Sequence, residues 1–282
     1  MVAELKPTRL FIIADGPRPG KNDEPLIQET KKIVENVSWP CEVTKIYSQE
    51  NLGCNSRIVS GLNEVFQKVD QAIVLEDDCV PHPSFFPYCE ALLEKYRDDE
   101  RVMNISGNFF LKDFEIQSDY YFTRYPHCWG WATWRRAWNK LDSKMERWPQ
   151  AKTEDILTGI LPGKAAVIYW TSVFDRTSRG EINSWAYRWL LTCWLENGLS
   201  INPRHNLVTN IGFGKDATHT KTENPLLSDL EAHALNFPLT HPHFVLASQR
   251  ADTLTENLIY SGGSTLDKIV KRIRHFQAGA RS

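Results

Sequence analysis

The stretch Ala72-Ile-Val-Leu-Glu-Asp-Asp78 places a continuous apolar run directly before three acidic residues. Four apolar residues in a row predict a short strand that is buried on both faces, as in the sheets of α/β proteins. Ligands of open α/β sheets bind at the carboxyl ends of the strands, where these acids would lie. Carboxylates that share a partly dry cleft repel one another unless a cation lies between them. The stretch therefore predicts an α/β fold with a divalent-metal site, the alternative being acids that cap the next helix.

Strands and helices are predicted to alternate on both sides of this stretch. Apolar or alternating runs predict strands at residues 9–14, 41–47, 72–75, 102–106 and 199–201. Amphipathic periods predict helices at residues 24–36, 55–68, 84–96, 184–197 and 266–276. Such alternation is typical of a mainly parallel sheet with right-handed crossovers. Beyond residue 107 the regular pattern gives way to irregular, aromatic-rich segments.

Composition limits the classes of function. The chain has 282 residues, of which 41% are hydrophobic and 24% charged, as in a folded globular protein. A formal net charge of −2 gives no overall attraction to nucleic acid. The six cysteines form no CxxC pair, which favours reduced thiols in a cytoplasmic protein. We expect no signal peptide and no membrane-spanning helix, because no apolar run is long enough.

Two further segments have the composition of ligand-binding loops. In His127-Cys-Trp-Gly-Trp-Ala-Thr133 a glycine between two tryptophans would let the backbone approach a ligand, although a packed turn is an equal alternative. The segment Asn210-Ile-Gly-Phe-Gly-Lys-Asp-Ala-Thr-His219 could supply a phosphate contact and a metal ligand. That role requires the second loop to fold back onto the acids at residues 76–78.

Together these segments resemble a known family. The order of Glu76-Asp77-Asp78 with Pro83-Ser-Phe-Phe86, the Trp129-Gly-Trp131 loop and the Trp185 helix leading to Gly212-Phe-Gly214 resembles bacterial GT-A glycosyltransferases related to glycosyltransferase family 2. It is also similar to N-acetylglucosaminyltransferase I. The resemblance covers residues 10–220, about three quarters of the chain. It implies a Rossmann-like GT-A fold with a mixed, mainly parallel sheet flanked by helices.

The resemblance also implies roles for single residues. Asp15 would bind the base of a UDP-sugar, Arg57 would reach the donor, and the loop formed by Trp129, Gly130 and Trp131 would shape its pocket. Asp78 would coordinate Mn²⁺ or Mg²⁺, and two further residues would lie nearby: Asp77 on the ribose or the metal, and Glu76 near the sugar. His219 would be the C-terminal metal ligand. The metal would stabilise the leaving nucleoside diphosphate.

The chain departs from the family pattern in two places. The family begins with a βα unit before the strand equivalent to residues 9–14, and only eight residues precede that strand here. We therefore expect the usual first unit to be missing, either because the chain is truncated or because the donor pocket is partly open. An inverting transferase also needs a carboxylate that accepts the proton of the acceptor hydroxyl. Near the start of the Trp185 helix the available acid is Glu181, with Asp175 as a second candidate.

We therefore expect an inverting, metal-dependent glycosyltransferase that acts on a glycan or lipid-linked acceptor of a bacterial surface polysaccharide. Residues 1–264 would form the GT-A domain, with a nucleotide-sugar-binding half at 1–106 and an acceptor-facing half at 107–264. Residues 265–282 would form a basic helix and tail, either packed on the domain or lying peripherally on the inner face of the membrane. The alternatives are a degenerate sugar-nucleotide-binding or interaction domain and a sugar nucleotidyltransferase.

Overall fold

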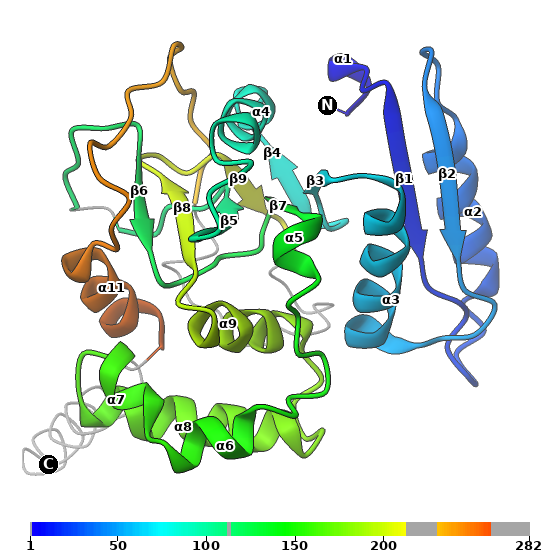
Figure 1. Cartoon of the computed structure of the whole chain (residues 1–282). Helices are drawn as coiled ribbons and strands as arrows, with labels where there is room; N and C mark the ends of the chain where they lie inside the picture. Colours follow the sequence, from blue (N-terminus) through cyan, green and yellow to red (C-terminus); the bar gives the residue numbers. More distant parts are fainter. Residues whose placement is uncertain (1, 112–113, 213–229, 261–282) are drawn as a thin grey trace, which may run out of the picture.

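The chain folds as a mixed α/β protein (Figure 1). The computed structural model describes residues 2–111, 114–212 and 230–260. The predicted tail helix and the candidate ligand His219 lie outside these ranges. Among the described residues, no helix has both the length and the apolar character required to cross a bilayer.

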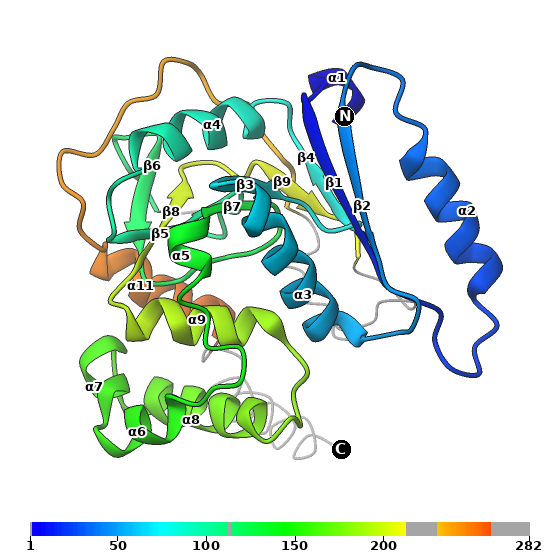
Figure 2. The same cartoon turned by 45° about the vertical axis from the view of Figure 1, so that its right-hand side comes forward.

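The N-terminal unit is a two-stranded parallel sheet with a helix on each side (Figure 2). After the short helix α1 (Val2–Leu5), strand β1 (Arg9–Ala14) pairs in register with β2 (Glu42–Tyr47). Helix α2 (Glu24–Glu35) connects the two strands, and α3 (Gly53–Lys68) follows β2 on the opposite side. The predicted elements of this region are therefore confirmed to within two residues at each end.

The second sheet has five strands in the order β3-β7-β5-β8-β6. Their bounds are β3 (Gln71–Val74), β5 (Val102–Ser106), β6 (Tyr120–Thr123), β7 (Trp131–Trp134) and β8 (Leu199–Pro203). Of the pairings within this sheet, β5–β8 is parallel, whereas β3–β7, β5–β7 and β6–β8 are antiparallel. The expectation of a mainly parallel sheet is therefore wrong, because the aromatic segment after β5 returns through the sheet as two reversed strands. A separate antiparallel pair joins β4 (Cys79–Pro81) to β9 (Val208–Asn210).

β1 and β3 do not pair with each other, so their sheets are separate. Helix α3 packs against both of them. Leu62 and Phe66 of α3 pack in one cluster with Ile13 of β1 and Val74 of β3. All residues of β3 are only partly buried, whereas β5 and β7 are buried along their whole length. The carboxyl ends of β1 and β3 thus belong to separate sheets that are held together through α3.

The rest of the chain forms helices around the five-stranded sheet. Their bounds are α4 (Phe85–Lys95), α5 (Arg135–Trp138), α6 (Trp148–Thr153), α7 (Ile156–Ile160), α8 (Lys164–Ser178) and α9 (Trp185–Leu195). A group of tryptophans fills the space between α9, α5 and β7, and Trp131 stacks on Trp185 with ring centroids 5.3 Å apart. A second aromatic group around Trp170 and Trp194 joins α8 to α9. Most of the excess tryptophan is therefore core.

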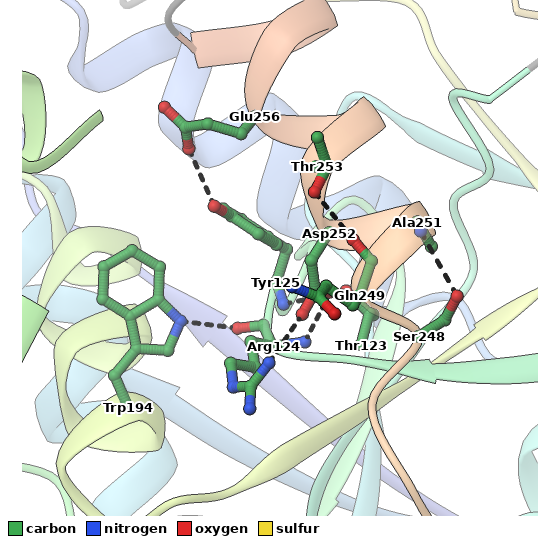
Figure 3. A network of polar contacts seen from close by, with 10 residues as sticks. All are labelled: Thr123, Arg124, Tyr125, Trp194, Ser248, Gln249, Ala251, Asp252, Thr253 and Glu256. Atoms are coloured by element: carbon green, nitrogen blue, oxygen red, sulfur yellow. Dashed lines mark hydrogen bonds and ion pairs between the residues drawn. The ribbon is translucent and has the colours of Figure 1, made fainter. Parts of the chain in front are cut away.

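The last described helices, α11 (Gln249–Thr255) and the π-helix η1 (Glu256–Tyr260), hold buried acids against β6 (Figure 3). Asp252 accepts hydrogen bonds from the Thr123 hydroxyl and from the backbone and side chain of Arg124. Glu256 accepts from the Tyr125 hydroxyl at 2.8 Å and from an indole of α8. These contacts join the sheet edge, α11 and the helical layer.

Replacing Asp252 by alanine should lower the free energy of unfolding by about 3 kcal/mol, because Arg124 then loses a buried partner. Burial raises the pKa of Asp252, although the hydrogen bonds from Thr123 and Arg124 oppose the shift. The variant Asp252→Asn keeps an oxygen for Thr123 and should lose only about 1 kcal/mol. Urea denaturation of both variants measures the difference. Equal stability of the alanine variant and the parent would contradict this assignment.

Candidate functional site

Four carboxylates gather at the carboxyl ends of β1 and β3. The pKa of Cys54, in the first turn of α3, shows that these carboxylates lie near one another. Its pKa is raised to about 11, first by burial and then by the negative charges of Glu76, Asp77, Asp15 and Asp78. Because acids that follow two different strands all raise the pKa of one thiol, both strand ends lie near Cys54. We call these four residues the acid cluster. The sequence predicted a group of acids only at residues 76–78.

Glu76 is the member of the acid cluster whose ionised form is disfavoured. Burial raises its pKa to about 7, and the charges of Asp78 and Asp77 add to the shift. A hydrogen bond from the Trp185 indole partly opposes it. Helix α9 thus begins at the acid cluster, a contact that the sequence did not predict. Repulsion among neighbouring carboxylates is what a divalent cation would relieve.

Asp78 lies against the segment that continues from β9. Its backbone oxygen accepts a hydrogen bond from the amide of Ile211 at 2.9 Å. Gly212 packs on its carboxylate so closely that a β-carbon at this position would overlap Oδ2. The segment that leads toward His219 therefore leaves β9 directly beside Asp78. Within the described ranges, no three His, Cys, Asp or Glu side chains are already arranged as a metal site.

Asp15 fixes the start of helix α3. Its Oδ1 accepts a hydrogen bond from the amide of Leu52 and its Oδ2 from the amide of Gly53, both at 2.9 Å. Oδ1 also accepts from the amide of Gly16 at 2.9 Å. Gly53 adopts φ +77°, which favours glycine. Because backbone amides hold both oxygens, Asp15 is a positioning residue in this structure, and its contact with a base stays a prediction.

Arg57 is buried one turn further along α3. Its Nε and Nη2 atoms have no hydrogen-bond partner among the described residues. A buried guanidinium without an anionic partner is costly, so the side chain is available to an anionic ligand or to a rearrangement that supplies one. This finding is consistent with the predicted contact to the donor but does not test it.

The tryptophan loop divides into an inner and an outer part. Trp131 is completely buried and stacks on Trp185, so it supports the loop from inside and does not line a pocket. Gly130 has φ +69° and leaves no space for a side chain beside Val208 and Leu75. Only Trp129 of the predicted pair is partly exposed. The expectation that both tryptophans shape a donor pocket is corrected accordingly.

The two candidate bases are held in surface ion pairs. Glu181 accepts from Nε of Arg179 at 2.6 Å, and this contact lowers its pKa. Asp175 accepts from the Trp148 indole at 2.9 Å and from Lys152 at 2.7 Å. Burial raises the pKa of Asp175, but the hydrogen bonds outweigh it and the net pKa is lowered.

Both carboxylates line one surface hollow of about 410 Å³ beside α8. Among the described residues, no hydrogen bond or ion pair connects either carboxylate to the acid cluster. Asn183 lies nearer to the cluster. Its side-chain Nδ2 is 3.4 Å from the position of a β-carbon on Gly53, whose backbone amide donates to Asp15. The segment between Glu181 and Trp185 therefore runs from this hollow to the edge of the acid cluster.

Comparison with models of known protein families and with curated proteins finds no match to this chain. The function is therefore argued from the residues and their arrangement.

Proposed function

We propose that the chain is an inverting, metal-dependent glycosyltransferase of the GT-A type that uses a UDP-sugar as donor. The observation that carries the proposal is the acid cluster, in which acids that follow β1 and β3 lie near enough to one thiol to raise its pKa. Carboxylates at strand ends, next to a helix that begins there, suit a cation and the diphosphate that it binds. The family resemblance of the sequence supplies the reaction type.

The residues fit a hard divalent cation. Asp78 and Asp77 offer oxygen ligands, which Mn²⁺ and Mg²⁺ prefer. The pKa of Glu76 is raised first by burial and then by the charges of these two residues. A cation that also binds two phosphate oxygens needs few protein ligands, so the absence of a ready three-residue group among the described residues is compatible with it. Such a metal stabilises the diphosphate as it leaves the sugar. His219 is proposed as a further ligand on the resemblance alone.

One observation favours a second candidate, a sugar-nucleotide-binding domain without transferase activity. Glu181 and Asp175 are both held by cationic side chains at the surface. An inverting transferase needs a carboxylate that is free to accept a proton. If neither residue is released when an acceptor binds, the domain binds its nucleotide and does not turn it over.

A thermal-shift series with UDP, GDP and ADP, each with and without Mn²⁺, tests the proposal. We expect UDP with Mn²⁺ to raise the melting temperature most, because a ligand of the native state stabilises it by mass action. Release of UDP from UDP-glucose, UDP-galactose or UDP-N-acetylglucosamine then separates a transferase from a binder. The absence of any nucleotide-dependent shift would refute both candidates.

Replacing Gly212 by alanine should weaken Mn²⁺-dependent UDP binding about tenfold, because the new methyl group forces the Asp78 carboxylate to move. Gly159 is a matched control, since a β-carbon there meets nothing within 4 Å. The variant Gly159→Ala should leave binding unchanged and, within α7, stabilise the fold slightly. Isothermal titration of UDP in Mn²⁺ measures both variants, and unchanged binding in Gly212→Ala would count against metal binding at Asp78.

A further inference from the structure

The chain segment that leaves β5 is fixed against the tryptophan loop. The amide of Gly107 donates to the Gly130 carbonyl at 2.8 Å, and the amide of Leu207 donates to the Gly107 carbonyl at 2.8 Å. A side chain at Gly107 would overlap Val208 and a ring of α4. This close crossing sets the next residue, Asn108, directly beside Trp129.

Asn108 is a fully buried residue with an unused hydrogen-bond donor. Its Oδ1 accepts from the backbone amide of Trp129 at 3.2 Å, and its own backbone amide donates to the Ser106 hydroxyl at 3.0 Å. Its Nδ2 has no partner among the described residues. Buried polar groups are normally paired, so a lone amide donor suggests a group that a ligand supplies.

Two aromatic side chains form a wall next to this donor. The rings of Phe110 and Trp129 meet at 86° with centroids 5.5 Å apart, and both side chains are partly exposed. Phe110 also packs at 4.5 Å on the ring of His127, whose pKa burial lowers to about 3, so the imidazole stays neutral. We call Phe110 and Trp129 the aromatic wall.

The aromatic wall stands beside the acid cluster. Gly130, the neighbour of Trp129, packs on Leu75, which directly precedes Glu76. Cys128 directly precedes Trp129 in the sequence. The pKa of its thiol is raised well above the usual value, first by burial and then by charges that include those of Glu76 and Asp78. The loop that carries Trp129 therefore approaches the acids from the β5–β7 side.

We propose that the aromatic wall and Asn108 form the subsite for the hexose ring of the nucleotide-sugar. This inference rests on the proposed function and deepens it. A hexopyranose offers an apolar C–H face to an aromatic ring and hydroxyl oxygens to the Nδ2 donor of Asn108.

The arrangement of the two sheets assigns the sugar, and not the nucleoside, to this wall. Within the five-stranded sheet β7 and then β5 follow β3. The separate sheet that contains β1 lies on the other side of β3 (Figure 1). A diphosphate held at Asp77 and Asp78 that places its nucleoside near Asp15 must extend its sugar toward β7 and β5. The segments at Phe110 and Trp129 leave or enter these two strands.

Binding of UDP, UDP-glucose, UDP-galactose and UDP-N-acetylglucosamine in the presence of Mn²⁺ tests the subsite. We expect the parent to bind at least one UDP-hexose more tightly than UDP. In Phe110→Ala this preference should fall about tenfold, while the affinity for UDP itself stays unchanged. Phe110→Tyr, which keeps the ring, should retain the preference. Phe109→Ala is a matched control, because the Phe109 ring contacts Tyr121 instead of the wall.

Asn108→Asp provides a second variant, since it keeps an oxygen for the amide of Trp129 and replaces the Nδ2 donor by a second acceptor oxygen, with an added buried negative charge. It should lose the UDP-hexose preference about as strongly as Phe110→Ala. A parent that binds UDP but prefers no UDP-hexose, or a Phe110→Ala variant that retains the preference, would overturn the sugar subsite alone. Loss of UDP affinity in Phe110→Ala would reassign the wall to the nucleoside. A parent without UDP binding would overturn the proposed function itself.

Discussion

Replacing Asp78 by asparagine should abolish the part of UDP binding that depends on Mn²⁺, the largest binding effect we expect. The amide is a poor ligand for a hard cation, whereas the carboxylate lies at the strand end beside Asp77 and Glu76. At UDP concentrations of about 100 times the dissociation constant, bound ligand contributes about 2.7 kcal/mol of stability. The variant should lose most of this increment in a thermal-shift experiment with Mn²⁺.

The unliganded variant provides an internal check. The charge of Asp78 raises the pKa of Glu76, so the ionised form of Glu76 is disfavoured in the fold. Removing that charge relieves the repulsion, and the melting temperature of Asp78→Asn without ligand should equal or exceed that of the parent. The control is Asp98→Asn, an exposed acid in the turn after α4. A variant at Asp78 that keeps its full Mn²⁺-dependent shift would remove this residue from the metal site.

Much of the fold follows from local patterns, but the strand directions do not. The apolar runs at Arg9–Ala14 and 72–75 mark β1 and β3 to within a residue. Strand β7 contains only Trp131-Ala-Thr-Trp134 and has no alternation, because both of its faces are buried. Its insertion between β3 and β5 depends on long-range packing of the tryptophans, which a single sequence does not encode as a period.

Helix α8 was missed although its sequence carries a signal. Ala166, Trp170, Val173, Phe174 and Thr177 are buried at helical spacing. The surrounding aromatic-rich sequence masks this period, because partly buried apolar residues such as Tyr169 lie between the core positions. Recognising the helix would have placed Asp175 on a surface helix before its structure was known.

The acids at residues 76–78 were predictable as a group, because they directly follow one apolar strand. The approach of Asp15 to them was not, because β1 and β3 belong to separate sheets that pack together through α3. The contact between Trp185 and Glu76 and the position of Asn108 were not predictable. Both depend on how segments more than 20 residues apart along the chain cross one another. Single buried side chains with unused donors become visible only when the packing around them is known.

Replacing Glu181 by glutamine should slow UDP release from a UDP-hexose by about 10²–10⁴-fold and leave UDP affinity unchanged, if the chain is a transferase with Glu181 as its base. A sugar hydroxyl or a water molecule is a poor nucleophile near neutral pH unless its proton is accepted as the bond forms. The ion pair of Glu181 with Arg179 is no obstacle in itself, because both side chains are about half exposed and such pairs contribute about 0–1 kcal/mol. An acceptor that enters beside Asn183 can therefore displace the arginine.

Two matched variants make this prediction decisive. Arg179→Gln removes the partner that lowers the pKa of Glu181 most, while Arg176 remains at 3.5 Å. A base at this position should therefore keep or gain activity as its pKa rises toward the ordinary range. Asp175→Asn weakens contacts to Trp148 and Lys152, and its effect should appear in the melting temperature instead of the rate. Full activity in Glu181→Gln would exclude Glu181 as the base. The domain would instead be a binder if the parent binds UDP with Mn²⁺ yet releases no UDP from any UDP-hexose, even with acceptor glycans present. In that case the carboxylates of Glu181 and Asp175 would serve only the surface ion pairs in which they are found.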